Sequence, residues 1–204
     1  GDWPDVLILS STYYSSYAAE GVLWDMTDAW DNSATKNSGR FTGDTVFDGL
    51  KIGGRLYGFA PTRGNGCVTY IKQAWLDAVG MAAPTTYEEF LAVCDAFVNQ
   101  DPDGDGAADT YALAAAGFVG NEAPFVNYLP NFYQDAYPFF IQQDDGTWVD
   151  GFTQPAMQGA LERLADAYAK GYIDPTTLTN GTKDCRNKFY DDTTGIFTYW
   201  AGTW

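Results

Sequence analysis

Four aspartates lie in one short segment at a spacing that suits a cation. They are Asp101, Asp103, Asp105 and Asp109, at positions 1, 3, 5 and 9 of a loop that begins Asp-Pro-Asp-Gly-Asp-Gly. Ca²⁺ takes roughly six to eight oxygen ligands, and alternating Asp residues deliver carboxylates to one point. Gly106 permits a sharp turn, and position 7 would offer the Ala107 carbonyl. The spacing therefore predicts one structural Ca²⁺ site with the ligands Asp101, Asp103, Asp105, Ala107 and Asp109.

The loop departs from an EF-hand at position 12, where Ala112 replaces the bidentate glutamate. Water or a distant side chain would have to complete the coordination. A solvated acidic turn without metal is the alternative, although carboxylates this close repel one another when no cation is present.

Aromatic side chains are the second candidate for chemistry. They make up 17% of the chain, with 7 Trp, 14 Tyr and 13 Phe. Part of this total belongs to a core. An excess of Tyr and Trp is also typical of sugar-binding clefts, because the apolar face of a pyranose stacks on a ring while its hydroxyls need hydrogen-bond partners.

Charge and composition exclude several classes of function. Lys and Arg number 11 against 27 Asp and Glu, which gives a net charge of −16, and there is no His. Nucleic acid would be repelled, because its binding needs clustered basic residues. The absence of His removes most zinc sites and Ser-His-Asp triads. No apolar run approaches the ~18 residues of a membrane span, so this chain is not expected to insert into a membrane.

Two alternatives to binding are a glycoside hydrolase and a calcium-dependent carbohydrate or adhesion module. A hydrolase needs two carboxylates about 5–10 Å apart. Helix faces or caps explain Glu88, Glu89 and Glu162, which leaves Glu122, in a Gly-Asn-Glu loop, as the interesting acid. Dockerins also carry Asp-rich loops, but they duplicate them, and this chain has one copy. The pairing of Cys67, Cys94 and Cys185 is left open.

The elements that must position these groups alternate between strands and helices, which is the pattern of an α/β fold. The run Asp5–Leu9 reads as a buried parallel strand. Ser10 to Thr12 then form a turn at its carboxyl end, where open α/β sheets bind ligands. Further predicted strands are Arg55–Ala60, Cys67–Ile71, Tyr111–Ala116 and Ile196–Trp200, with a hairpin over Pro138–Val149 that turns at Asp144-Asp145-Gly146.

The clearest helix spans Tyr87–Asn99. Thr86 and Glu89 form a capping box, and an apolar stripe follows. A second helix spans Pro155–Lys170, with Pro at its first position and Gly171 after its end. Shorter helices are predicted over Tyr14–Glu20 and Lys72–Val79.

Six segments, in this order, resemble an extracellular solute-binding protein of ABC sugar importers. They are Gly1–Val6, Gly53–Pro61, Trp75–Gly80, Pro84–Phe90, Asp101–Gly106 and Tyr168–Pro175. The resemblance is to the large, lipoprotein-like oligosaccharide binders that carry a calcium loop. It implies an α/β, periplasmic-binding-protein-like fold of two lobes that close on a sugar, incomplete in this chain. Residues 1–110 would belong mainly to a first lobe truncated at its N-terminus. Residues 111–204 would belong mainly to a second lobe truncated at its C-terminus.

The resemblance also implies a function without bond breaking: reversible capture of a carbohydrate outside the cell and its delivery to the permease subunits of the transporter. It places the full-length protein at the cell surface on a lipid anchor, or in the periplasm of a Gram-negative source, as a monomer. Its calcium loop is structural. Cleft residues are expected after the first strand, after the strand that ends at Pro61, in a Pro-bounded loop and at the last strand: Ser11, Thr12, Tyr13, Thr62, Arg63, Tyr133 and Trp200.

Overall fold

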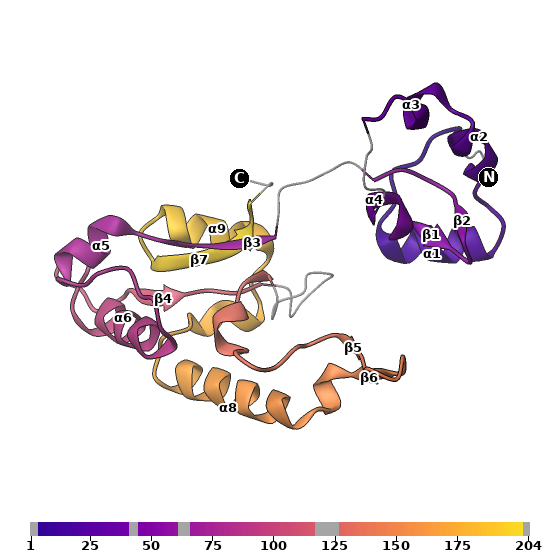
Figure 1. Ribbon diagram of the computed structural model, residues 1–204. Coiled ribbons are helices and arrows are strands. Elements are labelled where there is room, and N and C mark those ends of the chain that lie inside the picture. Colours follow the sequence, from indigo (N-terminus) through magenta and orange to yellow (C-terminus); the bar gives the residue numbers. More distant parts are fainter. Residues whose placement is uncertain (1–3, 41–44, 61–65, 117–126, 202–204) are drawn as a thin grey trace. The chain divides into compact units, whose positions relative to one another are not determined.

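The structure, a computed structural model, describes residues 4–40, 45–60, 66–116 and 127–201. It divides into two compact units, residues 1–63 and residues 64–204 (Figure 1). The units therefore meet at residue 63, whereas the expected lobe boundary lies at residue 110. How the chain is shared between the lobes of a longer protein stays a prediction.

The first unit is built from short helices and one hairpin. Its helices are α1 (Ser11–Ala19), α2 (Thr27–Asp31), α3 (Ala34–Asn37) and α4 (Thr45–Asp48), and its hairpin pairs β1 (Lys51–Ile52) with β2 (Arg55–Leu56). Gly53 and Gly54 both have positive φ angles, as the tight turn between the strands requires. Among the described residues of this unit, the buried core cluster is small and contains Trp30, Phe47 and Leu56.

The predicted strand over Asp5–Leu9 is wrong for this structure. The segment is irregular, and Val6 and Ile8 are 85% and 100% exposed. A strand needs a neighbour for its backbone groups, and no described residue pairs with this run. The predicted strand over Arg55–Ala60 is likewise confirmed only for Arg55 and Leu56.

A mixed three-stranded sheet forms the centre of the second unit. Its strands are β3 (Cys67–Ile71), β4 (Tyr111–Leu113) and β7 (Thr194–Trp200), in the order β3-β7-β4. The central strand, β7, is antiparallel to β3 and parallel to β4. The predicted strands over Cys67–Ile71 and Ile196–Trp200 are thus confirmed. The strand predicted over Tyr111–Ala116 is present but shorter than expected.

Helices and short turns surround this sheet. They are α5 (Gln73–Ala78), α6 (Tyr87–Asn99), α8 (Pro155–Ala169) and α9 (Thr182–Tyr190), with 3₁₀ turns η1 (Pro130–Phe132), η2 (Gly151–Thr153) and η3 (Pro175–Leu178). The α6 helix has the predicted bounds and the predicted capping box between Thr86 and Glu89. Aromatic and aliphatic side chains from α5, α6 and the sheet share one continuous core.

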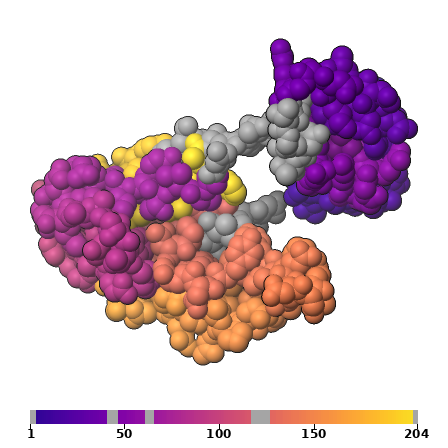
Figure 2. Space-filling view, in the orientation of Figure 1, coloured from indigo at the N-terminus to yellow at the C-terminus, as the bar shows by residue number. Residues whose placement is uncertain are grey.

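The predicted hairpin is also present. Its strands are β5 (Phe140–Gln142) and β6 (Trp148–Asp150), and it extends away from the three-stranded sheet (Figure 1). Gly151 lies against the backbone carbonyls of Tyr137 and Phe139, so closely that a Cβ atom would not fit there. The aromatic side chains of this hairpin are exposed, and the space-filling view shows the hairpin standing out from the body of its unit (Figure 2).

Candidate functional site

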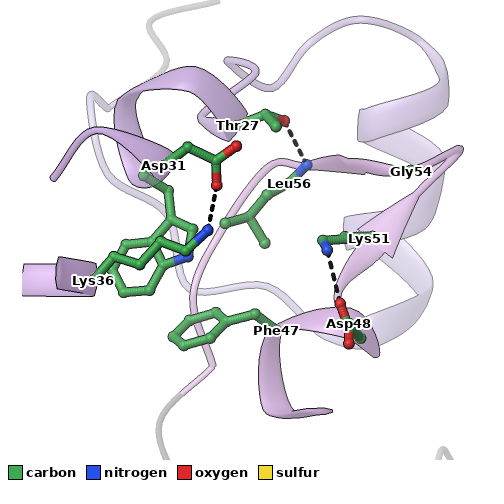
Figure 3. A pocket seen from close by; sticks show the side chains of 9 residues that line it. Thr27, Asp31, Lys36, Phe47, Asp48, Lys51, Gly54 and Leu56 are labelled. Atoms are coloured by element: carbon green, nitrogen blue, oxygen red, sulfur yellow. Dashed lines mark hydrogen bonds and ion pairs between the residues drawn. The ribbon is translucent and has the colours of Figure 1, made fainter. Parts of the chain in front are cut away.

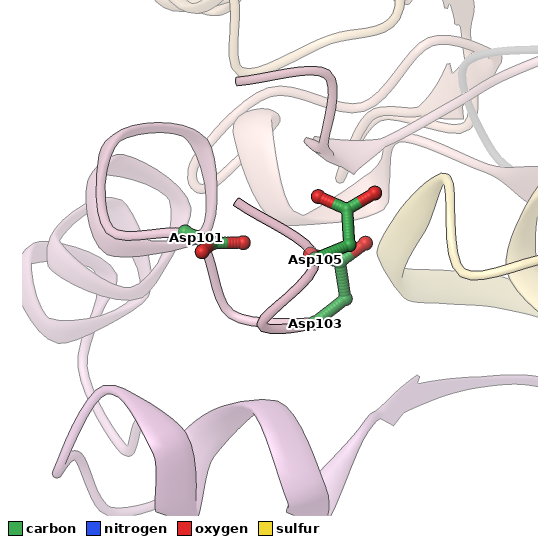
Figure 4. Close-up of side chains that lie close together, drawn as sticks. All are labelled: Asp101, Asp103 and Asp105. Carbon is green, nitrogen blue, oxygen red and sulfur yellow. The ribbon is translucent and has the colours of Figure 1, made fainter. Parts of the chain in front are cut away.

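The acidic loop connects the end of α6 to β4. Asp101, Asp103 and Asp105 each place a carboxylate oxygen within 4.8 Å of the others (Figure 4). Backbone hydrogen bonds fix the conformation of the loop: the amides of Gly104 and Gly106 both donate to the Asp101 carboxylate, at 3.1 Å. Both glycines have positive φ angles, as does Asp101 itself. Three of the five predicted metal ligands therefore converge.

The electrostatics of this cluster favour a cation. Partial burial, together with the neighbouring carboxylates of Asp101 and Asp105, raises the pKa of Asp103 above its ordinary range. One oxygen of Asp103 is buried and accepts no hydrogen bond from the residues described. A cation would satisfy this oxygen and relieve the repulsion, so the donor set fits a hard metal ion such as Ca²⁺.

Of the other two predicted ligands, Asp109 is exposed and lies outside the carboxylate cluster. Ala107 is exposed, and its predicted ligand atom is the backbone carbonyl rather than a side-chain oxygen. Just beyond them, the Thr110 hydroxyl donates to the Phe97 carbonyl at 2.7 Å and ties the end of the loop to α6. The roles of Asp109 and of the Ala107 carbonyl stay predictions.

The predicted sugar contacts fall in three different settings. Ser11, Thr12 and Tyr13 form the first turn of α1, not a turn after a strand, and all three are exposed. Tyr13 is 57% exposed and lies 5.8 Å from the Tyr17 ring. Thr62 and Arg63 lie outside the described residues.

Trp200 and Tyr133 differ sharply in accessibility. Trp200 ends β7 and is 41% exposed, and its indole nitrogen donates to the Asn127 side chain at 2.9 Å. Tyr133 is 5% exposed and packs against Met157 and Ala160. Burial raises the pKa of Tyr133 far above its ordinary range. In this structure Tyr133 is a packing residue, whereas the Trp200 ring is partly exposed, and its role as a ligand contact stays a prediction.

A pocket of about 170 Å³ in the first unit was not anticipated from the sequence (Figure 3). Apolar side chains of Trp30, Phe47 and Leu56 lie along it. Two ion pairs stand at its rim, Lys36 with Asp31 at 2.6 Å and Lys51 with Asp48 at 2.7 Å. Its lining comes from five elements, α2, α3, α4, β1 and β2, which is why no single sequence motif predicts it.

A second pocket, of about 250 Å³, lies in the second unit in front of the α6 N-terminus. It is bounded by β3, by the segment that leads into α6 and by the loop around η1. Asn131 lines this pocket. It lies in the Pro-bounded loop where the sequence predicts cleft residues.

The thiols are poor candidates for nucleophiles. Cys67, Cys94 and Cys185 are all free, so no disulfide forms among them. Burial raises the pKa of all three, in the case of Cys185 to about 12, and a thiol rather than a reactive thiolate is expected at neutral pH. Glu122, the acid that the hydrolase alternative singled out, lies outside the described residues.

The sequence is similar to two Bacillus subtilis proteins. The chain is 25% identical over 181 residues to the lipoprotein LipO of Bacillus subtilis, covering 85% of this chain and 34% of LipO. It is 29% identical over 120 residues to the polygalacturonan/rhamnogalacturonan-binding protein YtcQ of the same organism, covering 56% of this chain and 23% of YtcQ. No protein-family model matches the chain.

Solved structures agree with these sequence relatives. The Streptococcus pneumoniae ABC-transporter substrate-binding protein FusA, in complex with kestose, superimposes with a TM-score of 0.67 at 20% identity. The match covers 96% of this chain and 42% of FusA. The chain is related to the solute-binding proteins of ABC transporters. It shares their fold. It spans only part of their length, between 23% and 34% of the curated relatives that it matches.

One of the similar solved structures is also named for an EF-hand. A second FusA structure, in complex with fructo-nystose, is described as an EF-hand mutant, and it matches this chain with the same TM-score of 0.67 and 20% identity. The relatives named for a ligand are binding proteins.

Among the described residues, no helix is both long and apolar enough to cross a membrane.

Proposed function

We propose that this chain belongs to the substrate-binding component of an ABC importer, which captures an oligosaccharide outside the cell and delivers it to the permease. The observation that carries the proposal is the shared fold: 96% of the chain superimposes on a protein solved with a bound sugar. Two sequence relatives are also named for carbohydrate ligands. The full-length protein would be a monomer at the cell surface, held by a lipid anchor as the name of LipO suggests.

The described residues support capture rather than catalysis. Ring stacking on Trp200 and neutral hydrogen bonds are sufficient for reversible sugar binding, and neither requires a nucleophile or an acid with a shifted pKa.

Native mass spectrometry and calorimetry with fructooligosaccharides and with polygalacturonan fragments test the proposal. Saturable binding without release of reducing sugar is expected. Cleavage of a bound sugar would show that the chain is an enzyme, and no binding to any probe would refute capture by this chain.

We also propose that the acidic loop holds one structural Ca²⁺ through Asp101, Asp103 and Asp105, with the Ala107 carbonyl and Asp109 as further ligands. The cation would neutralise the carboxylates and fix the connection from α6 to β4. It would take no part in sugar chemistry.

Calorimetry after chelator treatment tests this site. Ca²⁺ should bind and raise the unfolding temperature, because a ligand that binds only the folded state stabilises it. The D103N variant should lose this shift. The matched variant D144N, in the hairpin turn, should keep it. A D103N protein that still gains the full shift would refute the site.

A further inference from the structure

The backbone around Trp200 is fixed on both sides of the residue. Trp200 is the last residue of β7 and pairs with Cys67, the first residue of β3, and the two strands lie side by side (Figure 1). The amide of Ala201 then donates to the Gly66 carbonyl at 3.1 Å. Hydrogen bonding between the two segments thus continues past Trp200, so the direction in which its side chain leaves the backbone is defined.

A hydrogen bond also holds the far end of this side chain. The Trp200 indole nitrogen donates to the Asn127 side-chain oxygen at 2.9 Å, an ordinary length for such a bond. A tryptophan side chain has two rotatable bonds, and a contact at the tip of the indole restricts both of them. The indole N–H points outward in the plane of the ring, so this hydrogen bond does not occupy the faces on which a sugar stacks.

Asn127 is itself attached to the strand that carries Trp200. Asn127 is buried, and so is the next residue in the chain, Tyr128. The Tyr128 ring contacts the rings of Phe197 and Tyr199, at centroid distances of 6.1 and 5.3 Å. Both of these partners lie on β7. The acceptor and the ring that it holds therefore share one rigid support.

The Trp200 side chain is also accessible, at 41% exposed. A ring that is immobilised before a ligand arrives loses little conformational entropy when a sugar stacks on it. A mobile ring must first be ordered, which costs roughly 2- to 10-fold in affinity. Trp200 thus combines an accessible ring with a fixed orientation, and Asn127 supplies part of that fixation.

We propose that Asn127 is a positioning residue for sugar capture, which fixes the Trp200 ring in the orientation in which a sugar stacks on it. The inference rests on the proposed function and deepens it, because it names a second residue that sets the strength of the predicted stacking contact. Asn127 acts through the indole N–H and need not touch the sugar.

The test is a double-mutant cycle between Asn127 and Trp200 in the full chain. Calorimetry measures the affinity for kestose, fructo-nystose and polygalacturonan fragments. N127A should weaken every probe that binds by about 2- to 10-fold. W200F keeps a ring but has no N–H. In the W200F background, N127A should have no further effect, because the bond through which Asn127 acts is already absent.

Two more variants separate positioning from a general loss of structure. N127D can still accept the indole hydrogen bond and should keep most of the affinity. Q142A removes an exposed amide on the hairpin and should change no affinity. Circular dichroism of each variant confirms folding.

A ¹⁹F spectrum of protein labelled with 5-fluorotryptophan gives a readout that needs no sugar. The Trp200 resonance is assigned by its loss in W200F. N127A should shift or broaden this resonance, because the ring gains freedom. The resonance of Trp148, on the exposed hairpin, is assigned in the same way and should not change.

The outcomes distinguish this inference from the proposed function. If wild type binds a probe and N127A binds it equally well, the inference fails and sugar capture stands. The inference also fails if N127A weakens binding as much in the W200F background as in wild type, or weakens it while the Trp200 resonance stays unchanged, because Asn127 would then act by another route. Failure of all three probes to bind wild type would refute the proposed function, and the inference with it.

Discussion

Asp174 is a buried carboxylate whose charge is fully compensated. It is 1% exposed, forms an ion pair with Lys188 at 2.8 Å and accepts hydrogen bonds from Thr176 and Asn180. Burial alone would raise the pKa of Asp174. The bonds from Lys188, Thr176 and Asn180 outweigh burial and lower this pKa below its ordinary value of 3.8. The folded state thus favours the charged form.

At this scale we predict that D174N lowers the free energy of unfolding by about 3 kcal/mol, because it leaves Lys188 half-buried without its partner. Since the folded pKa is lowered, the contribution is complete near neutral pH and is lost only as pH falls below about 4. Urea unfolding of wild type and variant across pH measures this difference.

D166N is the matched control for that experiment. Asp166 pairs with Lys170 on the surface of α8, where both side chains are more than half exposed. Its loss should cost less than about 0.5 kcal/mol. Equal effects of the two variants at neutral pH would show that the buried network around Asp174 does not stabilise the fold.

At the scale of elements, β7 packs tightly against its neighbours at Gly195. A Cβ atom added there would overlap the rings of Trp75 and Phe97, which meet edge to face with centroids 5.2 Å apart. We predict that G195A destabilises the second unit by about 1–3 kcal/mol, since these rings have no free space into which to move. Thermal unfolding measures the effect.

G159A serves as the control substitution. Gly159 lies within α8, and an added Cβ would meet only the guanidinium end of Arg163, at 3.3 Å. Alanine is favoured over glycine within a helix by roughly 0.5–1 kcal/mol. A gain in stability is therefore expected. A loss in G159A similar to that in G195A would contradict the argument from packing space.

Sequence signals succeeded where the stabilising interactions are local. The α6 bounds followed from Thr86, Glu89 and an apolar stripe, all within the helix or at its edge. The acidic loop was found because its cluster lies within five residues, Asp101 to Asp105. Asp109 is near in sequence, yet it is exposed and lies outside that cluster.

Elements and pockets that depend on distant partners could not be predicted in this way. The apolar run over Asp5–Leu9 reads as a strand, yet the residues described offer it no neighbour. The polar helix α9 was missed; Cys185 and Phe189, spaced as i and i+4, were the available signal. Tyr133 looked like a ligand contact, because sequence alone does not show that Met157 and Ala160 cover it.

For the molecule as a whole, the two units differ in how much core each one has. The second unit joins side chains from its sheet and helices in one cluster, whereas the first buries Trp30, Phe47 and Leu56 together with part of Leu50. Stability rises with the fraction of surface that folding buries, and a chain of about 60 residues is already marginal. The stability of the chain should therefore come mainly from residues 64–204.

We predict that residues 64–204, produced alone, fold and unfold cooperatively at nearly the same temperature as the main transition of the full chain. Residues 1–63 alone should show no cooperative transition, because a core as small as the cluster of Trp30, Phe47 and Leu56 cannot offset the entropy of ordering the segment. Calorimetry and circular dichroism on both pieces measure this. If the second unit also needs the first for its stability, residues 64–204 will melt many degrees below the full chain, and the division at residue 63 will not be a division in stability.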